Sequence, residues 1–243
     1  MSKRIIFSHG TKGGAGKSVV SDTLIDYLIK TGQPVLVIEC DQKVPDVARR
    51  YEGHVNGLLA DLAGDEESVV ADLLGHIDEA DEDTIVINLP GNVSDKMDGL
   101  AIALLAPALE EINARLVVTF ALSEYDSPGL ASESLQQGLA GVADQRIAVI
   151  NQHFVNIEKT WEDSAERTEW LESGGQEIIL PNLNDRVKPL IPAGPLSHYA
   201  ERNSPLTLGN RMLLKQWLTQ AHKIGEMIDA ATSGEVSEES TDD

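Results

Sequence analysis

Short apolar runs, rich in valine and isoleucine, recur along the chain and are separated by stretches with helical periodicity. They lie at residues 5–7, 35–38, 84–87, 116–120, 147–150 and 178–180. Within the runs apolar and polar residues do not alternate, which indicates strands that are buried on both faces. Strands and helices in alternation predict an α/β fold, with a mostly parallel central sheet and helices on both faces.

Periodicity also predicts two prominent helices, one near each end of the chain. Val20, Leu24 and Leu28 recur at every fourth position after the first run, as on the buried face of a helix. The second predicted helix spans residues 209–231, and one face of it should pack on the sheet. That face would carry Leu213, Trp217, Ala221, Ile224 and Ile228. Trp161 and Trp170 are interpreted as core residues rather than as a binding platform.

The composition predicts one cytosolic domain. A chain of 243 residues with 42% hydrophobic residues can bury a substantial core, and we expect a single domain over residues 1–232. The single cysteine, Cys40, suits a reducing cytoplasm. No apolar run reaches the length of a membrane span, and the first residues lead directly into a strand, so neither a membrane segment nor a signal peptide is expected. Residues 233–243 are acidic and are predicted to be disordered.

The charge balance bears on the partners that the chain could bind. Forty Asp and Glu residues stand against 19 Lys and Arg residues, which gives a net charge of −21. A polyanion is repelled by such a surface, so a nucleic-acid partner stays open but is disfavoured.

A glycine-rich segment, Gly-Thr-Lys-Gly-Gly-Ala-Gly-Lys-Ser at residues 10–18, lies between the first strand and the first helix. Strand, glycine loop and helix form the context of a phosphate-binding loop, in which backbone N–H groups point at phosphate oxygens. The backbone around the nucleotide would come from Gly13, Gly14, Ala15 and Gly16. Lys17 would reach the β- and γ-phosphates, and the Ser18 hydroxyl would bind Mg²⁺. A plain glycine turn is the alternative, and Thr11 departs from the simple pattern, which has glycine there.

The segment Lys12-Gly-Gly-Ala-Gly-Lys-Ser resembles the deviant Walker A box of the ParA/MinD ATPases, which belong to the SIMIBI class of P-loop NTPases. The resemblance extends from residue 1 to about residue 230, and Lys12 matches the early lysine that distinguishes this family. It implies that Lys12 reaches the nucleotide of a partner subunit, and therefore that a homodimer closes around ATP.

Ligands of open parallel sheets bind beyond the carboxyl ends of the strands, so the residues after each run are informative. The segment Glu39-Cys40-Asp41 resembles the family's Asp-x-Asp, which implies that Asp41 orients the attacking water. A turn-forming carboxylate is the alternative. Asn88 stands where the family has the Walker B aspartate. Its carbonyl oxygen can accept a hydrogen bond from a Mg²⁺-bound water but brings no negative charge, so weak Mg²⁺ binding and slow hydrolysis are predicted.

The ends of the later runs bear on the base of the nucleotide. Asn151 matches a family position that hydrogen-bonds adenine, and Gln152-His153-Phe154 follows it in place of the guanine-reading pattern. The resemblance therefore favours ATP over GTP. Pro181 matches a residue that lines the base pocket in relatives.

A group of basic residues lies in the last predicted helix, at Arg211, Lys215 and His222. Relatives that bind the nucleoid contact DNA phosphates from this region. An ordinary solvated helix face is the alternative, and it fits the acidic chain better.

These residues predict an ATP-dependent dimerising switch that positions, partitions or regulates a cargo, such as a plasmid, through a partner protein. ATP hydrolysis would be slow. The alternative is an ATP-binding adaptor with little or no hydrolysis, in plasmid partition, mobilisation or filament machinery, and Asn88 is its chief support. A small-molecule ligase or kinase of the same fold is disfavoured, because Lys12 belongs to the dimerising branch of the resemblance.

Overall fold

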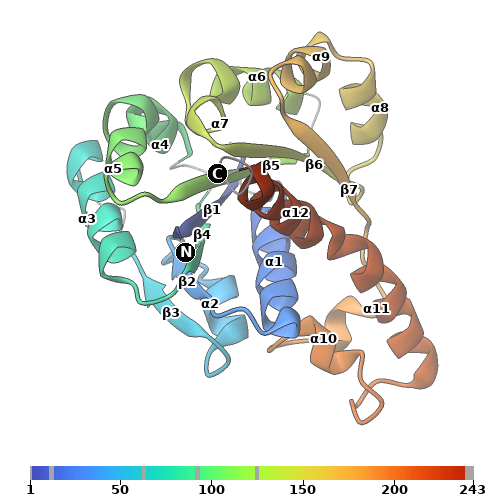
Figure 1. The fold of residues 1–243 in the computed structure, drawn as a ribbon. Coiled ribbons are helices and arrows are strands. Elements are labelled where there is room, and N and C mark those ends of the chain that lie inside the picture. The colour runs from blue at the N-terminus through green and yellow to red at the C-terminus, as the bar shows by residue number, and fades with distance from the viewer. Residues whose placement is uncertain (1, 11–13, 62–63, 91–93, 124–125, 239–243) are drawn as a thin grey trace.

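A seven-stranded sheet, parallel throughout, forms the centre of the computed structural model, which describes residues 2–10, 14–61, 64–90, 94–123 and 126–238 (Figure 1). The strand order is β3-β2-β4-β1-β5-β6-β7. The strands are β1 (Arg4–His9), β2 (Leu36–Glu39), β3 (Asn56–Leu59), β4 (Thr84–Asn88), β5 (Arg115–Leu122), β6 (Gln145–Asn151) and β7 (Gln176–Leu180). The predicted α/β class with a parallel sheet is therefore confirmed.

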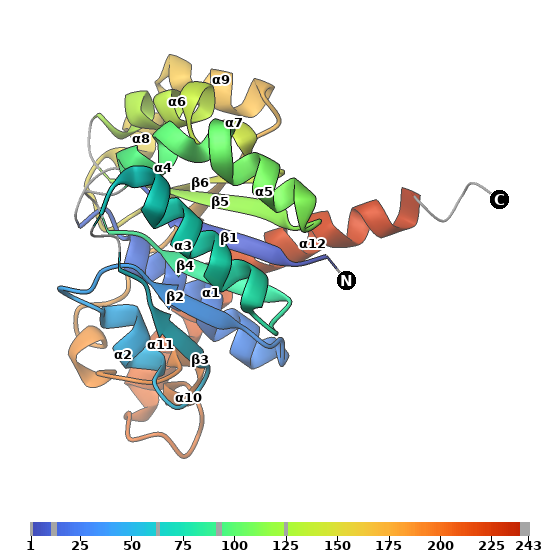
Figure 2. The same cartoon turned by 90° about the vertical axis from the view of Figure 1, so that its left-hand side faces the viewer.

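Helices cover both faces of the sheet (Figures 1 and 2). One layer contains α1 (Lys17–Thr31), α2 (Asp46–Tyr51), α10 (Leu196–Tyr199), α11 (Leu208–Ala221) and α12 (Lys223–Glu238). The other contains α3 (Glu66–Glu79), α4 (Ser94–Leu100), the π-helical turn η1 (Ala101–Leu105), α5 (Ala106–Glu111), α6 (Ser127–Gln137), α7 (Leu139–Val142), α8 (Ile157–Glu162) and α9 (Ala165–Glu172). A short 3₁₀ turn, η2 (Lys188–Leu190), precedes α10. No helix in the described ranges is long and apolar enough to cross a bilayer.

Successive side chains of the central strands point to opposite faces, so each strand contributes to two cores. In β1, Ile5 and Phe7 pack into the core under α3 to α9, whereas Ile6 packs against α1. Trp161 and Trp170 are fully buried in the first core, which confirms their interpretation as packing residues.

The edge strand β3 was not expected from the sequence. Its four residues, Asn-Gly-Leu-Leu at 56–59, are largely exposed and include no β-branched side chain. Parallel pairing with β2 holds the segment extended. Tertiary pairing, rather than local preference, therefore determines this strand.

The C-terminal helix differs from the single helix expected over residues 209–231. α11 ends at Ala221, and α12 begins at Lys223 after a break at His222. His222 is only 2% exposed, and its Nε2 atom lies 2.8 Å from Oδ2 of Asp26 in α1. It is therefore part of the core, and the predicted basic face with Arg211 and Lys215 is wrong on this point.

The buried face of α11 also differs from the predicted one. Leu213, predicted on the packed face, is exposed, whereas its neighbour Leu214 is buried with Trp217. α12 continues to Glu238, beyond the boundary proposed at residue 232. Disorder of residues 233–243 in solution stays a prediction.

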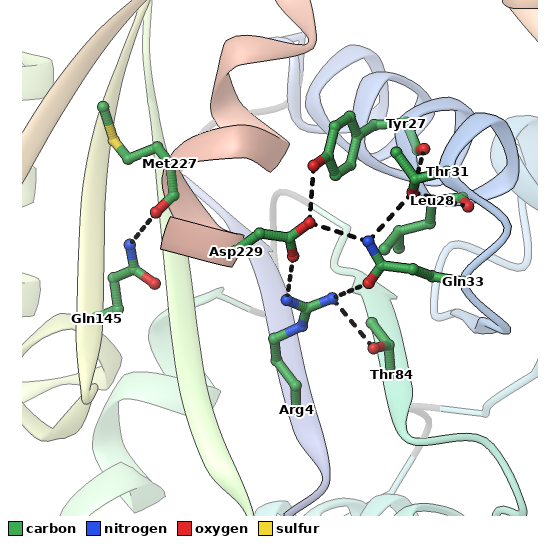
Figure 3. A network of polar contacts seen from close by, with 9 residues as sticks. All are labelled: Arg4, Tyr27, Leu28, Thr31, Gln33, Thr84, Gln145, Met227 and Asp229. Carbon is green, nitrogen blue, oxygen red and sulfur yellow. Dashed lines mark hydrogen bonds and ion pairs between the residues drawn. The ribbon is translucent and has the colours of Figure 1, made fainter. Parts of the chain in front are cut away.

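A polar network around Asp229 ties α12 to the start of β1 and the end of α1 (Figure 3). Oδ1 of Asp229 accepts a hydrogen bond from Arg4 Nη1 at 2.6 Å. Oδ2 accepts hydrogen bonds from Tyr27 Oη at 2.7 Å and from Gln33 Nε2 at 2.9 Å. Burial alone would raise the pKa of Asp229, but the hydrogen bonds from Tyr27, Arg4 and Gln33 prevail and hold it below its ordinary value.

Asp229→Ala is expected to lower the free energy of unfolding by about 2–3 kcal/mol at neutral pH, because the Arg4 guanidinium would stay buried without its carboxylate. A carboxyl whose pKa is depressed on folding stabilises the protein above its unfolded pKa and loses that effect as the pH falls through the folded one. The difference from wild type should therefore shrink below about pH 4. Urea unfolding at several pH values measures it. Glu226→Ala, an exposed change on the same helix, is the control, and equal losses for both variants would contradict the prediction.

Candidate functional site

Polar residues from several strand ends meet at the amino terminus of α1. The loop that precedes this helix contains Gly14 and Gly16, whose φ angles of 82° and 100° place them in the left-handed region. Only glycine adopts this region at low cost, so the backbone can turn sharply into the helix. Lys12 and Gly13 lie outside the described residues.

Lys17 is the first residue of α1 and is only 6% exposed. Its Nζ donates a hydrogen bond to the carbonyl oxygen of Gly10 at 2.8 Å, so the side chain folds back along the loop. The Ser8 hydroxyl donates to the Lys17 carbonyl oxygen at 2.8 Å and fixes the helix start to β1. Burial lowers the pKa of Lys17 to about 8, although the nearby negative charge of Asp41 opposes this shift. An anionic ligand such as a phosphate would stabilise the charged form of this buried amine.

Asn151, at the end of β6, braces the glycine loop. Its Nδ2 donates to the Ala15 carbonyl oxygen at 3.2 Å, and its Oδ1 accepts from the His153 backbone N–H at 3.1 Å. A Cβ atom at Gly16 would lie 2.2 Å from the same Nδ2. The close approach of loop and amide therefore requires glycine at position 16.

Gly16→Ala is expected to weaken nucleotide binding at least about tenfold, because the added methyl group displaces Asn151 and the loop. Gly32→Ala is the matched control. Gly32 also has a positive φ, 73°, but nothing lies within 4 Å of its Cβ position. Both variants bear the backbone strain of about 1–2 kcal/mol, which urea unfolding measures. Equal nucleotide affinities for the two would contradict the prediction.

At the ends of β2 and β4, Asn88 lies between two side chains that the sequence did not single out as its partners. Its Nδ2 donates to Glu39 Oε1 at 2.9 Å, and its Oδ1 accepts from Ser21 Oγ at 3.2 Å. Glu39 is fully buried, and burial raises its pKa although hydrogen bonds from Asp41, Asn88 and the following helix oppose the shift. A carboxyl group, which Asn88 itself lacks, is therefore present one side chain away.

Glu39 also holds the segment that follows β2. Its Oε1 accepts from the Asp41 backbone N–H at 3.0 Å, and its Oε2 accepts from the Val47 N–H at 3.2 Å. Asp41 is half-buried, and its Oδ1 accepts from the backbone N–H groups of Lys43 and Val44, both at 3.1 Å. Asp41 thus forms the turn that was the alternative to its water-orienting role. An acidic residue at the end of a largely buried apolar strand is the signal that could have identified Glu39.

The chemistry of these side chains fits a magnesium ion. Mg²⁺ prefers oxygen ligands, keeps several waters, and commonly takes one or two protein groups together with phosphate oxygens. Ser18 lies half-exposed in the first turn of α1, and Asn88 and Glu39 supply amide and carboxylate oxygens at the neighbouring strand ends. Among the described residues, no three His, Cys, Asp or Glu side chains gather into a metal cluster. Ser18, Asn88 and Glu39 therefore suit a magnesium ion that also takes ligands from a bound phosphate.

A cavity of about 380 Å³ opens beside the glycine loop. Gly14, Gly16 and Asn151 bound it on one side, and Pro181 and Trp217 on another. Trp217 Nε1 donates to the Pro181 carbonyl oxygen at 2.7 Å, which fixes this wall. The two positions predicted to contact the base, Asn151 and Pro181, therefore lie on one cavity with the loop. Larger hollows of about 610 and 660 Å³, beside β3 and between α6 and α8, contain none of the predicted site residues.

A glycine loop between the first strand and first helix of a parallel sheet, with a buried lysine at its end, defines a P-loop nucleotide-binding protein. Comparison with known families agrees. The CobQ/CobB/MinD/ParA nucleotide binding domain matches residues 6–230, and the chain belongs to this family.

Individual relatives cover most of the chain. Protein MobD from Acidithiobacillus ferrooxidans is 29% identical over an alignment of 235 residues, which covers 93% of this chain and 98% of MobD. A nucleotide-binding protein from Archaeoglobus fulgidus, solved in complex with ADP, is 12% identical with a TM-score of 0.50 over 77% of this chain and 84% of its own. The signal recognition particle receptor FtsY from Elizabethkingia anophelis is 12% identical with a TM-score of 0.52, over 90% and 66%. These structures share the fold of this chain.

Proposed function

We propose that the protein is an ATP-dependent dimerising switch of the ParA/MinD type, which acts on a cargo through a partner protein and hydrolyses ATP slowly in the cytoplasm. The observation that carries the proposal is the buried ammonium of Lys17 at the start of α1, beside a loop braced by Asn151 and a cavity of about 380 Å³. Membership in the nucleotide-binding family supports it. So does the ADP in the Archaeoglobus structure, which has the same fold.

Each residue of the site has a role in this proposal. The backbone N–H groups of residues 14–16 and the Lys17 ammonium stabilise the phosphates. Ser18 and, through a water, Asn88 hold Mg²⁺, which neutralises phosphate charge when bound. Asp41 orients the attacking water with its second carboxylate oxygen, Oδ2, because Oδ1 accepts the hydrogen bonds of the turn. Lys12 reaches the nucleotide of the partner subunit.

Size-exclusion chromatography with ATP, with ADP and without nucleotide tests the switch. A dimer is expected with ATP and a monomer in the other two conditions. Lys12→Ala should bind nucleotide but fail to dimerise, whereas Lys30→Ala, an exposed change at the end of α1, should behave as wild type. The same elution volume in all three conditions would contradict the switch.

A second candidate, an adaptor that binds ATP with little or no hydrolysis, is favoured by Asn88. Its amide is hydrogen-bonded to Glu39 and Ser21. The amide is neutral, so it does not attract a metal ion as a carboxylate would. Turnover per folded molecule, compared between the native protein and Asn88→Asp, separates the two. If the native protein hydrolyses ATP as fast as the variant, with and without its partner, the adaptor is excluded.

A further inference from the structure

Asp22, a residue that lines the cavity beside the loop, has a buried carboxylate oxygen with no hydrogen-bond partner among the described residues. Asp22 lies on α1, one turn beyond Val19, and lines the cavity with Gly14, Gly16 and Asn151. Its Oδ1 atom is buried and receives no hydrogen bond. Its Oδ2 atom lies 3.0 Å from Nε of Arg50, which lines the same cavity. One oxygen of the carboxylate is thus occupied, and the other is unsatisfied.

Further hydrogen bonds hold Arg50 and the backbone of Asp22 in place around this ion pair. Arg50 Nη1 donates to the Ile191 carbonyl oxygen at 3.1 Å, and the Arg50 carbonyl oxygen accepts from the Gly194 N–H at 2.6 Å. Tyr51 Oη donates to the Asp22 carbonyl oxygen at 2.7 Å and fastens α2 to α1. A buried charged acceptor without a donor is costly, and a ligand that brings a donor removes that cost. Burial raises the pKa of Asp22 to about 7 against the opposing charge of Arg50, which agrees with a shortage of donors.

The side chain expected to contact the base is already engaged elsewhere. Asn151 Nδ2 donates to Ala15 and Asn151 Oδ1 accepts from His153, so each group of its amide has a partner within the chain. Among the residues that line this cavity, Asp22 instead has an unsatisfied acceptor, its Oδ1 atom.

We infer that Asp22 Oδ1 accepts a hydrogen bond from the nucleoside part of the bound nucleotide, either from the amino group of the base or from a ribose hydroxyl. Asp22 is then a specificity-determining residue, held in place by Arg50. The inference rests on the proposed nucleotide-binding function.

Isothermal titration of the full chain with four nucleotides tests the assignment. They are ATP, purine riboside triphosphate, which lacks the amino group, and 2′-deoxy- and 3′-deoxy-ATP. One analogue should bind the wild-type protein about tenfold or more weakly than ATP, which is the usual effect of losing a hydrogen bond to a charged group. The analogue that binds more weakly than ATP identifies the group of ATP that donates the hydrogen bond to Asp22.

The variant Asp22→Asn provides the second part of the experiment. Arg50 Nε–H donates, so the new amide turns its carbonyl oxygen to Arg50 and its NH₂ group to the cavity, which replaces the acceptor by a donor. ATP should then bind the variant about tenfold more weakly than it binds the wild-type protein. The analogue that lacks the donor should bind the variant and the wild-type protein with equal affinity. Asp72→Asn, the same change at an exposed position of α3, should leave all four affinities unchanged.

Equal binding of all four nucleotides by the wild-type protein overturns the assignment of Asp22 and leaves the proposed function standing. A uniform loss for all four nucleotides in Asp22→Asn also overturns it. If the variant does not fold, the wild-type series decides alone. Failure of the wild-type protein to bind any of the four overturns both the assignment and the proposed function.

Discussion

Lys17→Ala is expected to weaken binding of ATP and ADP by a factor of about 100 or more, equivalent to roughly 3 kcal/mol. The Lys17 ammonium is buried at the amino terminus of α1, where it adds its charge to that of the helix end. No other described side chain lies in the loop before it to replace that charge. Isothermal titration with each nucleotide measures the loss.

Stability separates this effect from misfolding. Burial lowers the pKa of Lys17 to about 8, so the fold opposes the charged form that the phosphates require. Removing the ammonium should therefore leave the free energy of unfolding within about 1 kcal/mol of wild type. Lys30→Ala removes an exposed lysine from the last turn of the same helix and should change neither quantity. Unchanged nucleotide affinity in Lys17→Ala would overturn the proposed function.

Asn88→Asp is expected to lower the free energy of unfolding by about 2–4 kcal/mol at neutral pH without nucleotide. The amide of Asn88 donates to Glu39 Oε1 at 2.9 Å, and a carboxylate there would bring two acceptors together in a buried site. Burial already raises the pKa of Glu39, and a second carboxylate raises it further. A raised carboxyl pKa costs stability as the pH rises through it, so the loss should be smallest at acid pH.

Magnesium provides a second measurement on the same variant. A metal ion between two carboxylates neutralises their repulsion, so Mg²⁺ with nucleotide should raise the melting temperature of Asn88→Asp more than that of the native protein. Asn203→Asp makes the same substitution in an exposed loop and is the control. Equal stability of Asn88→Asp and the native protein from pH 5 to 8 would contradict the contact with Glu39.

The buried strands were predictable because their apolar runs are long enough to need two covered faces. β3 was not, since its Asn-Gly-Leu-Leu segment has neither the composition nor the burial of a strand and depends on pairing with β2. The break after α11 was missed for a similar reason. His222 continues the helical pattern of the sequence, but its contact with Asp26 joins residues that are far apart in the chain.

The glycine loop was the predictable part of the site, because its spacing is local. Asn88 was singled out from the sequence, but its contact with Glu39 was not foreseen. Their contact depends on β2 and β4 being neighbours in the sheet, which no local pattern encodes. Asp22 was overlooked because a carboxylate on α1 gives no sign of Arg50 beside it.

The position of β1 has a consequence for the order in which the protein is made. β1 is the earliest strand in the chain, yet it lies between β4 and β5, and Arg4 at its start contacts Asp229 of α12. The ribosome therefore releases the glycine loop long before the strands beside it, and before Pro181 and Trp217, which close the cavity. β1 can pair on both sides only after β5, which ends at Leu122, has been translated, and Arg4 can contact Asp229 only later still. Only a chain translated as far as Trp217 has all the residues that line the cavity.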